Sequence, residues 1–196
     1  MARPREFDRQ EVLAKATVLF WEKGFAETTL DELDRATGLH RGSIYNAFGD
    51  KRQLYLDCLD FYGEREMAAA AALLTGEPAA KAIRQLFGGL VTAVVKDGKR
   101  RGCLLCNASV DEAPYDPAVE ARVLAHIGTL RRAFSQSLSA YRPPRTSAER
   151  VALRRLADHL TASYMGLWVL AKAGFPEQVL RNVVASVMHS VDQIQA

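Results

Sequence analysis

The chain has few cysteines and no long hydrophobic run. Its three cysteines in 196 residues, an odd number, argue against a disulfide-stabilised scaffold and fit a reducing compartment. No segment approaches the roughly 18 consecutive apolar residues that a membrane-spanning helix needs, and the first residues lack the apolar stretch of a signal peptide. With 48% hydrophobic residues the chain can bury a core. We therefore expect a soluble, cytoplasmic protein with no membrane partner.

The N-terminal part of the chain has no excess of positive charge. The whole chain carries a formal net charge of +3, but residues 1–52 contain nine basic and nine acidic side chains. Bulk charge therefore does not predict nucleic-acid binding. The positions of the cations are more informative, because Arg3 and Arg5 precede the first expected helix, Arg41 lies within the segment described next, and Lys51 follows that segment. From these positions side chains can reach phosphates.

Residues 29–48 have the pattern of two short helices around a glycine. Thr29, with a glutamate three residues later, forms a capping box that starts a helix. Gly38 then supplies a turn, and Ile44 and Phe48 give the next helix one apolar face. This arrangement is typical of a helix-turn-helix, whose second helix enters the DNA major groove. The alternative is a plain helical hairpin with a solvated face.

Helices on both sides complete the predicted module. The preceding helix is expected to begin after the N-cap Asp8 and to end at Gly24, and the following one begins after Asp50. In the first helix of the motif, the residues expected to face inward are Leu30, Leu33 and Ala36.

The second helix of the motif presents polar groups on the face opposite its apolar residues. Arginine can pair with guanine or hold a phosphate, asparagine can read adenine, and hydroxyl groups suit phosphate oxygens. Glycine lets a backbone approach closely. A lysine in the first turn of the following helix opposes the macrodipole unless an anion is bound there. The DNA-binding candidates on this basis are Arg41, Gly42, Ser43, Tyr45, Asn46 and Lys51, with Arg3 and Arg5 from the N-terminal arm.

Over roughly residues 8–60 this ordered pattern resembles the DNA-binding domain of TetR-family transcriptional regulators. The matching residues are Gly24-Phe25, Thr28-Thr29, Leu33, Ala36-Thr37-Gly38-Leu39, Arg41-Gly42-Ser43-Ile44-Tyr45, Phe48 and Asp50-Lys51. The resemblance implies an all-helical homodimer with a C-terminal ligand-binding and dimerisation domain, usually a repressor that a small molecule releases from its operator. It also implies DNA contacts at the positions of Thr29, Arg41, Ser43, Tyr45 and Lys51.

Two positions depart from the pattern of the family. His40 stands where the family usually has a serine or similar cap, and Asn46-Ala47 stands where bulkier or histidine-containing pairs are frequent. We include His40 among the DNA-binding candidates because it begins the recognition helix.

The fold class that we predict is all-α. Residues 1–55 are expected to form a three-helix helix-turn-helix DNA-binding module, and residues 56–196 a helical-bundle domain for ligand sensing and dimerisation. Helical patterns are expected over residues 50–74, 79–96, 116–141, from 146 or 147 to 173, and 177–194, with a short apolar segment at 103–110.

The last two helices carry wide apolar stripes. Their members are Leu153, Leu156, Leu160, Tyr164, Leu167 and Trp168, followed by Val179, Leu180, Val183, Val184, Val187 and Val191. Such stripes can exceed what one core needs, and the resemblance implies a four-helix dimer interface there. A core within one subunit is the alternative. A dimer would read the two half-sites of a near-palindromic operator about 34–36 Å apart.

A Cys-x-x-Cys pair stands in the segment Gly102–Asn107. On a helix Cys103 and Cys106 lie on one face, and the basic run at residues 99–101 can lower a thiol pKa, which suggests a redox or electrophile sensor. The alternative is that both thiols pack as small hydrophobes, as we expect for Cys58. No second cysteine pair or paired histidines complete a tetrahedral site, so we expect no metal and no cofactor.

A small-molecule effector needs a pocket, which in helical bundles is mostly apolar and aromatic. The candidates for its lining are Phe61, Tyr62, Phe87, Phe134, Tyr164, Met165 and Trp168, with plain core packing as the alternative. A cysteine-dependent enzyme would need Cys103 with His126 or His159 as a base. No pattern brings those groups together and no glycine-rich phosphate loop is present, so we expect a regulator and not an enzyme.

Overall fold

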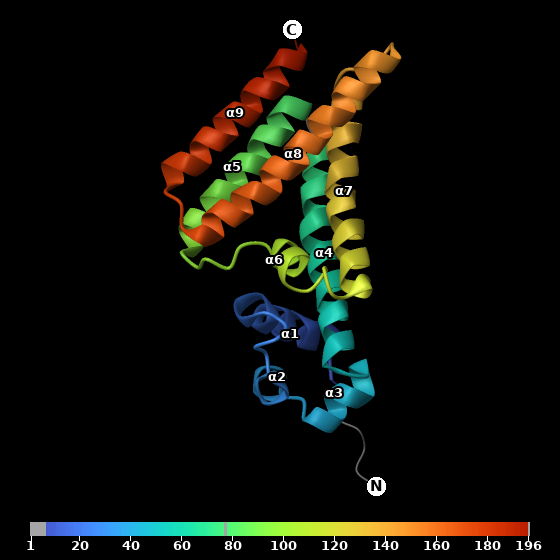
Figure 1. The fold of residues 1–196 in the computed structure, drawn as a ribbon, viewed down its shortest axis with the longest axis vertical. Coiled ribbons are helices and arrows are strands. Elements are labelled where there is room, and N and C mark those ends of the chain that lie inside the picture. Colours follow the sequence, from blue (N-terminus) through green and yellow to red (C-terminus); the bar gives the residue numbers. More distant parts are fainter. Residues whose placement is uncertain (1–6, 77, 196) are drawn as a thin grey trace.

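The computed structural model describes residues 7–76 and 78–195, and this part of the chain is helical throughout, without a strand (Figure 1). The predicted all-α class is confirmed. The helices are α1 (Arg9–Lys23), α2 (Leu30–Thr37), α3 (Arg41–Phe48), α4 (Lys51–Gly76), α5 (Ala79–Asp97), α6 (Leu104–Asp111), α7 (Pro117–Tyr141), α8 (Ser147–Ala173) and α9 (Glu177–Gln195).

Side-chain caps fix where several helices begin. Asp8 accepts a hydrogen bond from the Gln10 N–H at the start of α1. Thr29 and Thr146 each form a capping box with a glutamate three residues later, at α2 and α8. Asp116 caps α7, whose first residue is a proline. These caps satisfy backbone N–H groups that have no partner inside the helix, and those at Asp8 and Thr29 lie where the sequence predicts them.

The N-terminal module has its own apolar centre. Phe20 from α1, Leu33 from α2 and Ile44 from α3 are buried, and Tyr55 of α4 makes an edge contact with Phe20 at 5.0 Å between ring centroids. Helices α1 and α3 both pack on α4. The first turns of α4 are therefore part of the module.

One inward position in α2 is corrected. Ala36 is exposed, and the neighbouring Thr37 is buried in its place. The Thr37 hydroxyl donates to the Leu33 carbonyl at 2.6 Å and accepts from the Leu39 N–H at 3.2 Å. A threonine whose hydroxyl is satisfied in this way can be buried at low cost, and its hydrogen bonds help to hold the turn.

Helix α4 links the two parts of the molecule. It runs without a break from Lys51 to Gly76, so the boundary that we propose between residues 55 and 56 falls inside a continuous helix. Figure 1 shows α4 rising from the N-terminal module to lie beside α7 in the upper part of the molecule. One continuous helix therefore joins the two parts of the molecule.

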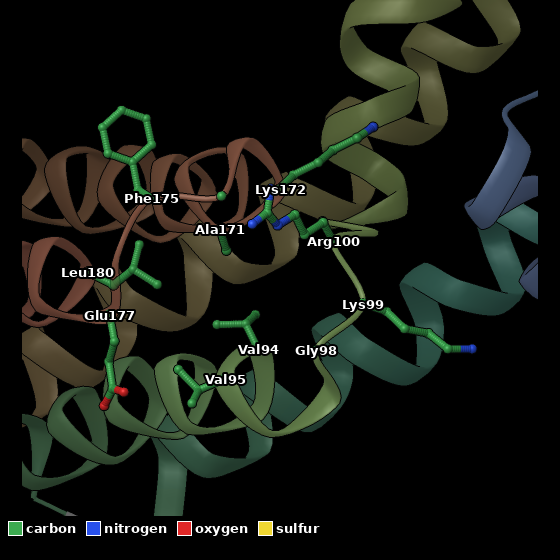
Figure 2. Close-up of a pocket in the computed structure, with 12 residues that line it drawn as sticks. Val94, Val95, Gly98, Lys99, Arg100, Ala171, Lys172, Phe175, Glu177 and Leu180 are labelled. Carbon is green, nitrogen blue, oxygen red and sulfur yellow. The ribbon is translucent and has the colours of Figure 1, made fainter.

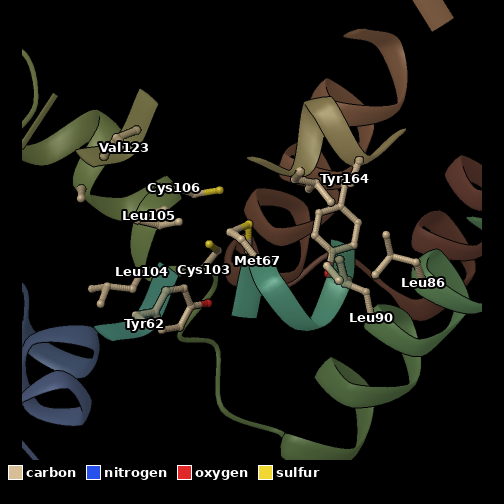
Figure 3. Packing of buried hydrophobic residues seen from close by; sticks show 14 of the residues in the cluster. Tyr62, Met67, Leu86, Leu90, Cys103, Leu104, Leu105, Cys106, Val123 and Tyr164 are labelled. Atoms are coloured by element: carbon tan, nitrogen blue, oxygen red, sulfur yellow. The ribbon is translucent and has the colours of Figure 1, made fainter. Parts of the chain in front are cut away.

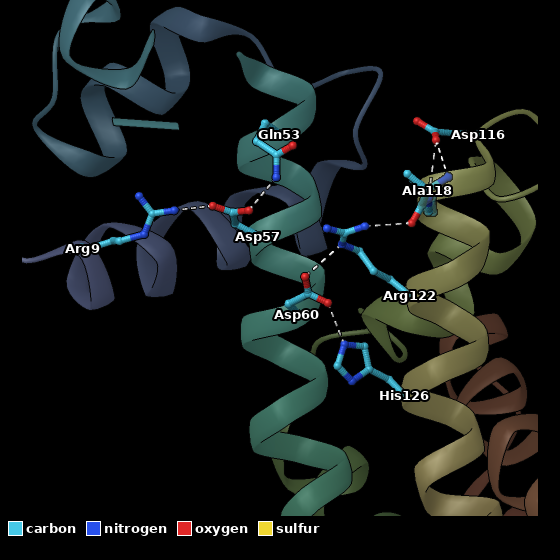
Figure 4. Close-up of polar contacts among 9 residues, drawn as sticks. Arg9, Gln53, Asp57, Asp60, Asp116, Ala118, Arg122 and His126 are labelled. Atoms are coloured by element: carbon cyan, nitrogen blue, oxygen red, sulfur yellow. Dashed lines mark hydrogen bonds and ion pairs between the residues drawn. The ribbon is translucent and has the colours of Figure 1, made fainter. Parts of the chain in front are cut away.

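The packing of α4 on α7 is unusually close at one point. Gly63 is buried in the middle of α4, and a Cβ atom there would collide with the imidazole ring of His126. The ring is held by Asp60, whose carboxylate lies 2.9 Å from both His126 Nε2 and Arg122 Nε (Figure 4). A glycine costs about 1 kcal/mol in a helix interior, and here it makes room for the histidine.

Helices α5, α8 and α9 form the other side of the C-terminal domain (Figure 1). Much of the two predicted stripes lies in the core of this one subunit. The buried members are Leu153, Leu156, Leu160, Tyr164 and Leu167 on α8, and Leu180, Val187 and Val191 on α9. These eight residues are therefore used by the core of one subunit, whereas Trp168, Val183 and Val184 are only partly buried and remain available to a dimer surface.

No helix in the described ranges is long and apolar enough to cross a membrane.

Candidate DNA-binding interface

Helix α3 turns one face inward and the other outward. Ile44 and Phe48 are buried against the module, as predicted from their spacing. Arg41, Gly42 and Asn46 are exposed, and Tyr45 keeps 47% of its surface. A large aromatic side chain that stays half exposed on a short helix has its ring and hydroxyl free for a partner.

The turn between α2 and α3 has a defined geometry. Gly38 has φ +74°, in the left-handed region that glycine adopts at low cost. His40 is the N-cap of α3 but makes no capping hydrogen bond with its side chain. Its Nδ1 lies instead 3.2 Å from the Asp34 carboxylate, and the ring is exposed. The histidine therefore leaves N–H groups at the start of α3 available to an outside acceptor.

Arg41 and Ser43 occupy the first turn of α3. The Arg41 guanidinium lies 3.0 Å from the Asp31 carboxylate of α2, in an ion pair whose partners are both largely exposed. Exposed pairs of this kind contribute little free energy, so the guanidinium can exchange this carboxylate for a phosphate. Ser43 is half-buried beside it.

Lys51 begins α4 as predicted, and the structure shows what holds it there. Its ammonium lies 4.5 Å from the centre of the Phe25 ring and 3.5 Å from the Ala26 carbonyl oxygen. Partial burial lowers its pKa. A cation–π contact of this kind stabilises the lysine at a helix start without a bound anion. The unfavourable position of Lys51 at the positive end of the helix dipole therefore does not by itself require a bound anion.

The remaining candidates differ in how far the structure describes them. Thr29 is exposed, but its hydroxyl is engaged in the cap of α2. Arg3 and Arg5 lie outside the described residues. The structure brings the other candidates to the α3 side of the module, around the helix and its two ends.

Arg9 is a positioning residue that sequence reasoning missed. Its guanidinium donates to the Ala47 carbonyl at 2.8 Å, lies 4.3 Å from the centre of the Phe48 ring, and pairs with Asp57 of α4 (Figure 4). It thereby ties α1 to the end of α3 and to α4. Ala47 is 38 positions away in sequence, so no local pattern signals the contact.

Together these features define a class of protein. Two short helices at a fixed angle, with the second showing a polar and aromatic face, form a helix-turn-helix. The fold and this face therefore define a helix-turn-helix protein with the features of a DNA-binding module.

Comparison with known proteins identifies the family. Residues 12–58 match the family model described as bacterial regulatory proteins, tetR family. The HTH-type transcriptional regulator YezE of Bacillus subtilis (strain 168) is 30% identical over 174 residues, which cover 88% of this chain and 90% of YezE. The HTH-type transcriptional repressor ComR of Escherichia coli (strain K12) is 24% identical over 188 residues, 95% of this chain and 90% of ComR. The chain belongs to the TetR family.

A solved structure supports the same assignment over the whole chain. The TetR family transcriptional regulator CifR, as a cysteine mutant with operator DNA, is 28% identical and superposes with a TM-score of 0.82. The match covers 95% of this chain and 98% of CifR. These relatives are regulators, which points to a role other than catalysis.

The cysteine pair lies at the start of α6. Cys103 is the N-cap of this helix, and both Cys103 and Cys106 are buried (Figure 3). A hydrogen bond from the Cys106 thiol lowers the pKa of Cys103, although burial acts in the opposite direction. The same contact, with burial, raises the pKa of Cys106. The pKa values of the two thiols are therefore shifted in opposite directions by their mutual contact.

Both cysteines line a cavity of about 270 Å³ between α6 and α8, which we call the thiol cavity. Trp168 and Lys172 of α8 line its other side, with Asn107 of α6. Cys58 is fully buried in α4, as Cys103 is in its own segment, but burial there raises the pKa of Cys58 to about 12. Packing, as expected, accounts for Cys58.

The structure does not bring the seven predicted pocket residues around one cavity. Phe87 contacts both Phe134 and Tyr164, at 6.2 and 5.5 Å between ring centroids, as part of the buried core. Phe61 lies under the Arg65 guanidinium, and Tyr62 makes an edge contact with Trp21 of α1. Three of the seven lie at the thiol cavity or its cysteines: Trp168 lines it, the Met165 sulfur is 3.4 Å from the Cys106 sulfur, and the Tyr62 side chain hydrogen-bonds with Cys103.

A second cavity, of about 160 Å³, lies where the loop after α5 meets the end of α8 and the start of α9. Figure 2 shows Arg100 beside Ala171 at its inner side and Phe175 at its outer side, while Lys172 points away toward α6. The Arg100 guanidinium fills the space that a Cβ atom at Gly174 would need.

Metal and catalytic alternatives gain no support from the described part of the chain. No group of three or more histidine, cysteine, aspartate or glutamate side chains is arranged there to hold a metal ion. His126 is engaged by Asp60, and His159 is exposed on α8.

Proposed function

We propose that the protein is a homodimeric repressor that binds a near-palindromic operator and releases it when a small molecule binds. The observation that carries this proposal is the outward face of α3, with Arg41, Tyr45 and Asn46 opposite the buried Ile44. ComR is a repressor, and CifR was solved with 26-bp operator DNA, which supports the same activity here.

The exposed groups of α3 suggest a division of roles. Arg41 and Asn46 carry the donors and acceptors that read base edges in the major groove. Tyr45, Ser43 and the N–H groups left open by His40 suit phosphate oxygens. Lys51, held over Phe25, would supply a phosphate contact next to the recognition helix, and Thr29 would supply another at the start of α2.

A second copy of the chain would pack on small residues at the surface of α8 and α9. Ala162 is exposed, and a Cβ atom at Gly166 would meet open space. Ala185 and Ser186 are exposed on α9. Small side chains let helix axes approach closely, so these faces suit a four-helix interface that uses little of the apolar stripe already buried in the subunit.

Selection of genomic DNA with the purified protein tests this function. We expect one enriched, near-palindromic sequence with half-sites about one helical turn apart. The double variant Arg41→Ala, Tyr45→Ala should bind that sequence at least about 10- to 100-fold more weakly. Retained affinity in the double variant would contradict the assigned docking face, and failure to enrich any sequence would contradict the function.

A second candidate function is a thiol-responsive regulator, favoured by the shared cavity and the opposite pKa shifts of Cys103 and Cys106. In this function the Cys103 thiolate attacks a peroxide oxygen and becomes a sulfenic acid, with water or an alcohol as the leaving group. The Cys106 thiol then displaces water to form a disulfide. If the variant Cys103→Ser, Cys106→Ser releases DNA on oxidation as the wild type does, the thiols are structural.

A further inference from the structure

The thiol cavity lies next to a loop that contacts the DNA-binding module. The loop comprises residues 98–102 and joins the end of α5 to the segment that begins α6. The Trp21 indole of α1 donates to the Gly102 carbonyl at 3.1 Å, and the Arg101 guanidinium stacks on the same indole at 4.4 Å. Ion pairs from Glu22 of α1 to Lys99 and Arg101 add to this contact.

The same loop is tied to the cavity by one side chain. Asn107 donates from Nδ2 to the Arg101 carbonyl at 3.0 Å, and its Oδ1 accepts from Lys172 Nζ at 2.8 Å. Both Asn107 and Lys172 line the thiol cavity. A continuous series of hydrogen bonds therefore runs from Lys172 on α8, through Asn107 and the loop, to Trp21 on α1.

The loop has little freedom to absorb a change at Asn107. Gly102 has φ +70°. A Cβ atom at this residue would lie only 3.1 Å from the side-chain Cδ of Lys172. Arg101 also pairs with Asp97 at the end of α5. A displacement of Asn107 or Lys172 therefore acts on the Arg101 carbonyl, one peptide before the Gly102 carbonyl that accepts from Trp21.

We propose that the thiol cavity is the effector site and that this series of hydrogen bonds transmits its occupancy to α1. The proposal rests on the regulator function given above and assigns its effector site. An occupant that accepts from the Lys172 ammonium draws it into the cavity and away from Asn107 Oδ1, which loosens the loop on Trp21 and shifts α1 against α4. The recognition helix moves with α1, because Arg9 joins α1 to the end of α3.

The lining of the cavity indicates the chemical class of the occupant. Val110, Val169 and the Trp168 ring give it apolar walls, and Lys172 is the cation among the lining residues. Asp111 lines the same cavity and would oppose a fully charged anion. A small, mainly apolar, neutral molecule with a carbonyl oxygen fits both conditions, because the oxygen accepts from the ammonium without a net charge.

Iodoacetamide is a suitable probe, because it carries a carbonyl group and bonds to the cavity at a known atom. A cysteine thiolate displaces iodide, a carbon–sulfur bond forms, and the thiol proton goes to solvent. The chain has two tryptophans, so the variant Trp168→Phe leaves Trp21 as the only indole. Its fluorescence then reports on the far end of the hydrogen-bond series.

We expect labelling to shift the emission of Trp21 and to weaken binding of the selected operator at least tenfold. The variant Asn107→Asp keeps the oxygen that faces Lys172 but loses the donor to Arg101. In the Trp168→Phe background this variant should be labelled equally, by mass spectrometry, yet show no further change in Trp21 emission or in operator affinity. The control variant Cys103→Ser, Cys106→Ser should show no response to the reagent.

Two results would overturn the proposal and leave the regulator function standing. One is full labelling with unchanged operator affinity, which would exclude the cavity as the effector site. The other is an Asn107→Asp protein that responds as its parent does. The variant Trp21→Phe, read by operator affinity alone, gives an independent check, because it keeps a ring under Arg101 and removes only the indole donor. Absence of any operator binding by the wild type would instead overturn the proposed function.

Discussion

At the scale of single residues, Cys103 is the group whose chemistry depends most on its surroundings. The Cys106 thiol and the N–H groups at the start of α6 stabilise its thiolate, against the effect of burial. For Cys58, burial is the largest influence on the pKa and raises it to about 12. Two buried thiols in one protein should therefore differ in reactivity.

We predict that the rate of Cys103 alkylation rises with pH with a midpoint below the ordinary thiol value of about 8.5. The thiolate is the nucleophile, and a lowered pKa means that more of it is present at neutral pH. Mass spectrometry of peptides, sampled over time between pH 6 and 9, measures the rate. Labelling of Cys58 at the same rate as Cys103 would contradict the prediction.

The two faces of α3 give a second prediction at this scale. Ile44→Ala should lower the free energy of unfolding by about 2–5 kcal/mol, because it leaves a cavity in the module. Tyr45→Ala, on the exposed face, should change stability by less than about 0.5 kcal/mol and still weaken operator binding. Urea unfolding with a DNA-binding titration separates the two effects. Equal loss of stability in both variants would mean that the faces are wrongly assigned.

At the scale of secondary-structure elements, the capping box of α2 combines several small contributions. Thr29 accepts from the Glu32 N–H, and Glu32 in turn accepts from the Thr29 N–H and pairs with Lys23 of α1. These contacts, with Lys23 first, lower the pKa of Glu32 to about 2. The cap therefore also fixes α2 to the end of α1.

Thr29→Ala is expected to cost about 0.5–2 kcal/mol of stability, as for other N-cap replacements. Thr29→Ser keeps the cap and serves as the control. If Thr29→Ser restores stability and operator affinity while Thr29→Ala loses both, the cap explains the whole effect. Restored stability without restored affinity would instead indicate that the methyl group contacts DNA.

The pH dependence of this element follows from the lowered pKa of Glu32. The unfolded value is about 4.3, so the stabilising charge on Glu32 is fully present above that pH and is lost as the pH falls toward 2. The stability difference between wild type and Glu32→Gln should therefore shrink between pH 5 and pH 3. Urea unfolding at a series of pH values measures it, and a constant difference would contradict the assignment.

Local sequence patterns were sufficient for most helices and for one face of the candidate site. The caps at Asp8, Thr29 and Thr146 lie within three residues of the groups that they bond, so the sequence predicts them directly. In the eight-residue helix α2, periodicity could not decide between Ala36 and Thr37, because two turns contain too few positions to fix a face.

Contacts between distant segments could not be predicted in this way. Trp21 and Gly102 are 81 positions apart, and no periodicity relates them. The lining of a ligand pocket could not be predicted for a similar reason. A helical stripe shows that residues share a face, but not whether that face meets a cavity or, as for Phe87 and Phe134, another side chain.

At the scale of the whole molecule, function depends on the distance between two recognition helices and so on the dimer. We predict that Ala162→Arg converts the protein to a monomer, because the long cation would face the small residues of the second copy. Operator affinity should then fall by about 10²–10⁴, the usual gain from two linked sites. Light scattering and DNA titration measure the two effects.

Ala121→Arg is the matched control for this prediction, since Ala121 is an exposed alanine on α7. It adds the same charge at a site away from α8 and α9 and should remain dimeric. A dimeric Ala162→Arg protein would place the interface elsewhere. Unfolding of Ala162→Arg would show in circular dichroism and is not expected, because the position is exposed in the subunit.

The close contact between Gly63 and His126 has a consequence for the history of this family. A side chain at residue 63 and a ring at residue 126 cannot occupy the same space, so a larger residue at position 63 is tolerated only with a shorter side chain at position 126. Among descendants of a common ancestor, the two positions should therefore be replaced together. Chains with alanine or larger residues at 63 should carry a shorter side chain at 126 and, having lost the imidazole, a different partner for Asp60.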